Sequence, residues 1–187
     1  MNKEKFYDSI RASLFLGKLS QKQVDGINSI LNHWDKNGYK DLRWLAYILG
    51  TVYHETAKTM QPIAEYGKGR GKRYGKKIDV DGKPYIIPNQ IYYGRGHIML
   101  TWRANYMRFS KRLNIPLLAN PDLMLQTDVS IAVLFDGMIN GLFTGVGLGR
   151  YFNAHYTDWI NARKVINLTD KAELIADYAK KFMNAIE

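Results

Sequence analysis

The segment from Leu42 to Thr56 is apolar on nearly all of its helical faces, and it constrains the fold more than any other feature. Asp41 stands immediately before it, in the position of a helix cap. A helix that is apolar on every side has to be surrounded by other elements. The segment therefore predicts a central buried helix with the rest of the chain packed around it.

Helical patterns continue on both sides of this segment. A first amphipathic stretch ends before Gly17, and a capping box at Ser20–Gln23 opens a second helix that Gly38 ends. The pattern as a whole predicts a mainly α-helical chain. The later helical patterns cover residues 102–113, 128–140 and 170–186.

Residues 66–90 interrupt the helical pattern and are rich in glycine and basic residues. Within them, Lys77–Val80 and Pro84–Ile87 flank the turn sequence Asp81-Gly82, which predicts a β-hairpin. We therefore expect a single catalytic domain over residues 1–187. A small β-hairpin lobe of approximately residues 58–92 is inserted in its helical body.

The chain of 187 residues has 27 basic and 17 acidic residues, a formal net charge of +10. A charge of this sign favours an anionic partner, although it also fits a protein that needs charge only for solubility. The basic run 68–77 predicts contact with an anionic cell envelope or an outer membrane, or else a solvated loop. Nucleic-acid binding is not expected, because the run lacks a recognition helix or an aromatic-interleaved strand.

The chain has no cysteine, so disulfides and thiolate chemistry are excluded. Its first residues lack the apolar core of a secretory signal, and no apolar run reaches the length of a membrane span. We therefore expect synthesis and folding in a cytoplasm. A substrate outside the membrane would then be reached through a pore made by another protein.

Glu55 is the first candidate for catalysis. It ends an apolar stripe on the helix Leu42–Thr56, where a carboxylic acid resists ionisation and suits a general acid. The alternative is a solvated or salt-bridged glutamate at a helix end. His54-Glu55 is half of a zinc motif, but Lys58 occupies the position of the second histidine, so no metal and no cofactor are expected.

Glu65 follows the same helix, at the entry to the glycine-rich stretch. Two carboxylates that face each other across a cleft are the usual means of cleaving a glycosidic bond. One protonates the leaving oxygen, and the other activates water or attacks directly. The spacing of Glu55 and Glu65 in the sequence does not by itself show that they form such a pair.

Three blocks of sequence resemble family 19 of the glycoside hydrolases. Residues 92–106 read Y-Y-G-R-G-H-I-M-L-T-W-R-A-N-Y, close to the family block Y-Y-G-R-G-P-x-Q-L-[ST]-W-x-x-N-Y. Residues 46–56 resemble its helix A-x-x-L-A-T-x-x-H-E-T, and residues 162–167 resemble its segment A-R-x-x-I-N. The family includes plant-type chitinases and a branch of phage endolysins, and the blocks occur in the family's order.

The resemblance implies a lysozyme-like, mainly α fold of the α+β type, with the small lobe beside the cleft. It also implies that Glu55 is the general acid and that Glu65 activates water for an inverting hydrolysis. Thr101 matches the hydroxyl that helps to hold this water. The positions that match substrate-binding or cleft-lining residues are Tyr93, Arg95, Asn105 and Asn167, with a purely structural role as the alternative for Tyr93 and Arg95.

Two positions depart from the family pattern: His97 stands for a proline, and Met99 stands for a sugar-binding glutamine. Together with the basic run, they shift the expected substrate from chitin to the glycan strands of peptidoglycan. We therefore expect a monomeric endolysin of the muramidase type without an obligate protein partner. The alternatives are a chitinase and a non-catalytic wall-binding module.

Overall fold

A computed structural model describes residues 1–86 and 90–187. The described residues are mainly helical, with one antiparallel sheet of two short strands, β1 (Ile63–Ala64) and β2 (Arg95–Gly96). The expected fold class, mainly α with a small β element, is confirmed. The α-helices are α1 (Lys3–Ser13), α2 (Gln21–Asn37), α3 (Leu42–Glu55), α4 (Arg103–Leu113), α5 (Thr127–Asn140) and α6 (Ala172–Ile186), and the 3-10 helices are η1 (Arg73–Lys76), η2 (Pro121–Leu125), η3 (Leu148–Arg150) and η4 (Asn161–Val165).

The chain forms two compact units. The first unit comprises residues 1–60 and 134–187, and the second comprises residues 61–133. The second unit begins close to the expected start of the small lobe but continues beyond residue 92, so that it also contains α4. The interpretation of the whole chain as one catalytic domain stays a prediction. None of the helices in the described residues is both long and apolar enough to span a membrane.

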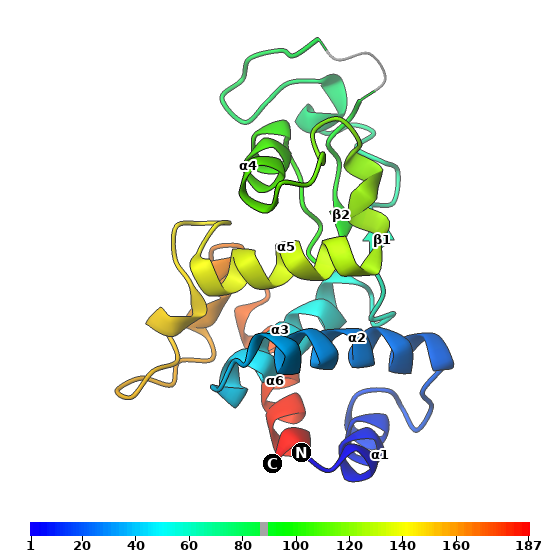
Figure 1. The fold of residues 1–187 in the computed structure, drawn as a ribbon, viewed down its shortest axis with the longest axis vertical. Coiled ribbons are helices and arrows are strands. Elements are labelled where there is room, and N and C mark those ends of the chain that lie inside the picture. The colour runs from blue at the N-terminus through cyan, green and yellow to red at the C-terminus, as the bar shows by residue number, and fades with distance from the viewer. Residues whose placement is uncertain (87–89) are drawn as a thin grey trace. The chain divides into compact units, whose positions relative to one another are not determined.

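The first unit is built around α3, as its apolar sequence predicts. All residues of α3 from Leu45 to Tyr53 are buried. α6, red in Figure 1, packs against α3 and also against α1. The crossing of α3 and α6 is close at Gly50, where an added Cβ would lie 2.7 Å from the backbone nitrogen of Ala179. Small residues at this crossing therefore let the two helices approach.

The predicted helix boundaries in the first unit are confirmed by their caps. Ser20 and Gln23 form the reciprocal capping box at the start of α2, and Gly38 ends that helix in the left-handed conformation with φ of 68°. The side chain of Asp41 accepts a hydrogen bond from the backbone nitrogen of Arg43 and caps α3.

The sheet of the second unit differs from the predicted hairpin. Strands β1 and β2 pair Ile63 with Gly96 and Ala64 with Arg95. Between the predicted hairpin strands, only one bridge forms, from Ile78 to Pro84; of these strands, Ile87 lies outside the described residues. The backbone nitrogen of Asp79 donates to the carbonyl oxygen of Lys83, at 2.9 Å, and that of Tyr85 donates to the carbonyl oxygen of Lys77, at 3.0 Å. The predicted antiparallel turn is therefore present, but in the described residues it is shorter than the two strands that were predicted. An isolated two-stranded hairpin is marginally stable, and here the turn packs on α4 through a side chain instead.

That side chain is the carboxylate of Asp79. Its Oδ1 atom accepts hydrogen bonds from the backbone nitrogens of Val80, at 2.8 Å, and of Ala104, at 3.1 Å. Trp102, at the N-cap position of α4, contributes no side-chain cap. The carboxylate of Asp79 therefore serves as the cap of α4, supplied from a distant turn.

Replacement of Asp79 by alanine tests this cap. We expect Asp79→Ala to lower the free energy of unfolding by about 1–2 kcal/mol, as loss of a helix cap does. Asp81, on the same turn, is a matched control, because its partners are the backbone nitrogen and the ammonium of the nearby Lys83. Urea unfolding followed by tryptophan fluorescence compares the two; equal effects would contradict the assignment.

Candidate active site

Glu55 is the last residue of α3, in the first unit. The helix ends there because Ala57 and Lys58 have left-handed backbone conformations, with φ of 49° and 69°. Thr56 is buried, and its hydroxyl donates to the carbonyl oxygen of Val52, at 2.7 Å. The same hydroxyl accepts a hydrogen bond from the backbone nitrogen of Met60, at 3.0 Å. The threonine of the His-Glu-Thr motif thus fixes the turn that follows Glu55.

The carboxylate of Glu55 makes an ion pair with Arg163. The Nη2 atom of Arg163 lies 2.9 Å from Oε1 of Glu55, and the two side chains are 3% and 17% exposed. The Nε atom of Arg163 donates to the carbonyl oxygen of Asp170, at 2.9 Å. Its Nη1 atom has no hydrogen-bond partner among the described residues. The salt-bridged alternative for Glu55 therefore describes its surroundings better than an apolar stripe alone.

Arg163 is the main residue of this site that was not predicted from the sequence. It belongs to the block A-R-x-x-I-N, which drew attention only for its asparagine. That asparagine, Asn167, is exposed, and its backbone nitrogen donates to the carbonyl oxygen of Arg163, at 3.0 Å. Asn167 therefore lies one turn of the chain after Arg163, the cation that pairs with Glu55.

The residue before Glu55, His54, shows which other charges lie nearby. Burial is the main cause that lowers the pKa of His54, and the charge of Glu55 acts in the opposite direction. The cations of Arg163 and Lys171 add to the lowering. Lys171 therefore lies near the end of α3, although 116 residues of sequence separate it from Glu55 (171 minus 55).

Glu65 follows β1 in the second unit, and both of its carboxylate oxygens have a partner. Oε2 accepts a hydrogen bond from the backbone nitrogen of Gly94, at 3.0 Å, and Oε1 accepts one from the hydroxyl of Tyr74, at 2.7 Å. The backbone nitrogen of Glu65 donates to the carbonyl oxygen of Gly94, at 2.7 Å. These bonds extend the β1–β2 pairing and fix the direction of the side chain.

Thr101 lies beside the same glycine. A Cβ added to Gly94 would lie 3.4 Å from Oγ1 of Thr101. The hydroxyl of Thr101 is therefore a neighbour of Gly94, whose backbone nitrogen binds the carboxylate of Glu65. Oγ1 of Thr101 donates to the carbonyl oxygen of Met99, at 2.8 Å, and the side chain of Asn105 donates to the carbonyl oxygen of Thr101, also at 2.8 Å. The second unit thus brings three predicted site residues to one place.

Arg95 is buried within the second unit and has several partners there. Its Nε atom lies 2.7 Å from Oδ1 of Asp122, and its Nη1 atom donates to the carbonyl oxygen of Ile91, at 2.9 Å. Its guanidinium lies 3.5 Å from the ring centroid of Tyr93. These contacts favour the structural alternative for Arg95 and Tyr93, and binding of substrate by either residue stays a prediction.

His97, which departs from the family pattern, is also a packing residue. It is fully buried, and both its backbone nitrogen and its Nδ1 atom contact Oγ of Ser130, at 2.7 and 2.8 Å. The neighbouring Gly96 has φ of 88°, and an added Cβ would lie 2.6 Å from the same Oγ. The motif therefore fits closely against the start of α5.

Metal ligation has no visible basis in the described residues. They contain no group of three or more histidine, cysteine, aspartate or glutamate side chains that could hold a metal ion.

No protein-family model matches the chain. Two endochitinases of Arabidopsis thaliana are each 45% identical to it over 40 residues, which is 21% of this chain and 14% of each plant enzyme. Among solved structures, chitinase C from Streptomyces griseus superposes with a TM-score of 0.54 and 20% identity, covering 98% of this chain and 68% of that one. A bacterial family 19 chitinase superposes with a TM-score of 0.55 and 16% identity, covering 99% and 94%.

These likenesses show the class of fold to which the chain corresponds. It has the lysozyme-like, mainly α fold with a small sheet that the family 19 chitinases have. The chain is therefore chitinase-like in fold, as the three sequence blocks predicted. The match to the plant enzymes spans a small part of their length. It therefore does not establish the activity or the substrate of this chain.

The bond between Tyr74 and Glu65 leads to a test by titration. Burial is the main cause that raises the pKa of Tyr74 to about 12, and the hydrogen bond and charge of Glu65 add to it. We expect Glu65→Gln to lower this pKa, because the negative charge is removed while burial remains. Tyrosine-labelled NMR spectra recorded against pH measure it, with Tyr74→Phe used to assign the signal. An unchanged pKa in Glu65→Gln would contradict the contact.

Proposed function

We propose that this protein is a glycoside hydrolase that cleaves the β-1,4 bond between N-acetylmuramic acid and N-acetylglucosamine in peptidoglycan. The observation that carries the proposal is the pair of carboxylates at Glu55 and Glu65 on a chitinase-like fold. Within the first unit Glu55 pairs with Arg163, and within the second unit Glu65 accepts hydrogen bonds from Tyr74 and Gly94. Glycosidic bonds are usually cleaved by two carboxyl groups with different roles.

Glu55 is assigned the role of general acid. A general acid gives its proton to the leaving oxygen and is left as a carboxylate. The guanidinium of Arg163, 2.9 Å from Oε1, stabilises that carboxylate and fixes its direction. The role of Arg163 is therefore electrostatic support of the acid rather than direct attack on the sugar.

Glu65 is assigned the role of the base that activates water. A carboxylate can accept about four hydrogen bonds, and Glu65 accepts two from Tyr74 and Gly94. It therefore keeps capacity to accept a bond from water, and the hydroxyl of Thr101 lies beside it as a second partner for that water. Asn105 and Asn167 are proposed to bind the N-acetyl sugars through their amides.

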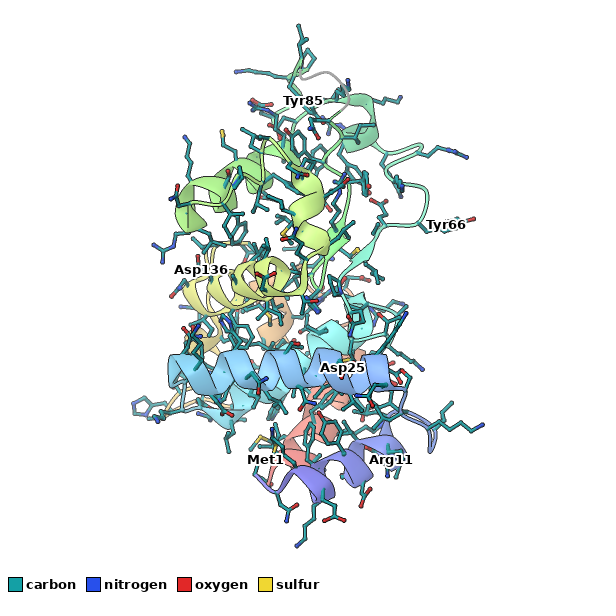
Figure 2. The ribbon with its side chains drawn as sticks, turned by 45° about the vertical axis from the view of Figure 1, so that its right-hand side comes forward. Met1, Arg11, Asp25, Tyr66, Tyr85 and Asp136 are labelled. Carbon is teal, nitrogen blue, oxygen red and sulfur yellow. The ribbon has the colours of Figure 1, made fainter. Side chains whose placement is uncertain are left out.

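The preference for peptidoglycan over chitin rests on charge. Lys68, Arg70, Lys72 and Lys76 are exposed, and none makes an ion pair within the described part of the chain. Tyr66, just before them, is fully exposed and projects away from the ribbon in Figure 2. Such a surface attracts an anionic wall or envelope, whereas unmodified chitin carries no charge.

The biological role that we propose is that of an endolysin. It would act as a monomer without cofactor, made in the cytoplasm of a host cell. It would reach the wall through a membrane pore of holin type and lyse the cell by cutting glycan strands. The second candidate is a chitinase, which the names of the similar solved structures favour.

Substitution of the two glutamates tests the proposal. We expect Glu55→Gln and Glu65→Gln each to lower the release of reducing ends from peptidoglycan by at least about a hundredfold, which is the usual contribution of acid–base catalysis. Binding to the insoluble wall should persist in Glu65→Gln. The exposed Glu4 on α1 supplies a matched control, since Glu4→Gln changes charge equally.

The outcomes separate the alternatives. Full activity in Glu55→Gln, with an unchanged fold by circular dichroism, would contradict the mechanism. Soluble oligosaccharides from chitin, with peptidoglycan left intact, would establish the chitinase. Wall binding without new reducing ends from the wild-type protein would establish a non-catalytic wall-binding module.

A further inference from the structure

A hollow opens on the surface of the first unit where α6 begins. It has a volume of about 430 Å³. This volume lies within the range of about 300–1,000 Å³ that is usual for small-ligand sites. The residues that line it are Ile160, Thr169, Lys171, Ala172, Glu173 and Leu174.

The hollow is connected to Glu55 through Arg163. This arginine pairs with Glu55 through Nη2 and binds the carbonyl oxygen of Asp170 through Nε, each at 2.9 Å. Asp170 stands between Thr169 and Lys171, and both of these residues line the hollow. One buried guanidinium therefore joins the carboxylate of Glu55 to the wall of the hollow, so a polymer bound at Glu55 has the hollow nearby.

The lining combines apolar surface with both signs of charge. Ile160 and Leu174 are 47% and 40% exposed, which is unusual for large apolar side chains and leaves apolar surface for a ligand. Lys171 and Glu173 are exposed, and neither makes an ion pair among the described residues. The hollow therefore offers a cation, an anion and aliphatic contact within a few residues.

This chemistry does not match a bare N-acetylglucosamine chain, which carries no charged group. It matches a short peptide that has carboxylates, an amine and small aliphatic side chains. Peptidoglycan carries such a peptide on the lactyl group of its muramic acid residues, whereas chitin carries none. The bond that Glu55 is proposed to cut lies beside a muramic acid, and so close to the attached peptide.

We propose that the hollow is a subsite for the stem peptide of peptidoglycan. Lys171 binds a peptide carboxylate, Glu173 binds the amine, and Ile160 and Leu174 contact the aliphatic side chains. The inference rests on the proposed function and deepens it, because it makes the peptide a determinant of specificity. It explains how a chitinase-like fold would select a muramic-acid polymer.

Two substrates made from one preparation test the proposal. Linear glycan strands that keep their peptides are compared with the same strands after an amidase has removed them. We expect the wild-type protein to have the higher kcat/KM on the peptide-bearing strands. Lys171→Gln should lower the ratio of the two kcat/KM values about threefold, the size expected for a solvent-exposed ion pair. The ratio cancels any effect of the lost charge that the two substrates share.

The control variant is Lys180→Gln. Lys180 is exposed on the same helix, lies outside the hollow and loses the same charge. It should leave the ratio unchanged. The substitution at Lys171 is to glutamine because the backbone there has φ of 57°, so a non-glycine side chain is kept and backbone strain is held constant. Equal loss in both variants, or equal wild-type kcat/KM on the two substrates, would overturn the subsite.

A binding measurement separates this inference from the catalytic proposal. The soluble stem tetrapeptide is titrated into the ¹⁵N-labelled wild-type protein, because a free peptide contains no glycosidic bond to cleave. Shifts confined to residue 160 and residues 169–174, weakened in Lys171→Gln, would support the subsite even if hydrolysis fails. No shift at millimolar peptide would overturn it, whatever the activity on glycan strands.

Discussion

A buried guanidinium holds together the part of the first unit that contains Glu55. The free-energy cost of burying a charge is large unless that charge is paired and hydrogen-bonded, and the side chain of Arg163 is 3% exposed. It is compensated by the carboxylate of Glu55 and the carbonyl oxygen of Asp170. These two bonds tie the end of α3 to the segment that precedes α6, and α6 packs on α3 in turn. The direction of the Glu55 side chain thus follows from the need to neutralise a buried cation.

The second unit contains a comparable arrangement with a different result. Arg95 is buried against Tyr93 and pairs with Asp122, and it stabilises the motif strand without facing a predicted acid. The carboxylate of that unit, Glu65, is held instead by a backbone nitrogen and the hydroxyl of Tyr74. One carboxylate therefore has a cation as its closest partner, and the other has neutral donors. The two proposed catalytic carboxylates therefore differ in the charge of the groups that fix their direction.

The sequence predicted those features that depend on local pattern. The apolar run Leu42–Thr56 predicted the central helix, and Ser20–Gln23 predicted a cap that the structure contains. The partners of these elements escaped prediction, because Arg163 follows Glu55 by 108 residues (163 minus 55) and no periodicity connects them. The cap of α4 by Asp79 was missed for the same reason. The candidate site residues could be predicted because they lie in sequence blocks that resemble a known family. The residues that fix their side chains could not, because they are distant in the sequence.

The central proposal is that the protein cuts a defined glycosidic bond beside a muramic acid. Mass spectrometry of purified peptidoglycan digested by the protein tests this most directly, because the new reducing end identifies the bond that was cut. We expect fragments that end in N-acetylmuramic acid and that do not form with Glu55→Gln. Fragments that end in N-acetylglucosamine, or no fragments from the wild-type protein, would contradict it.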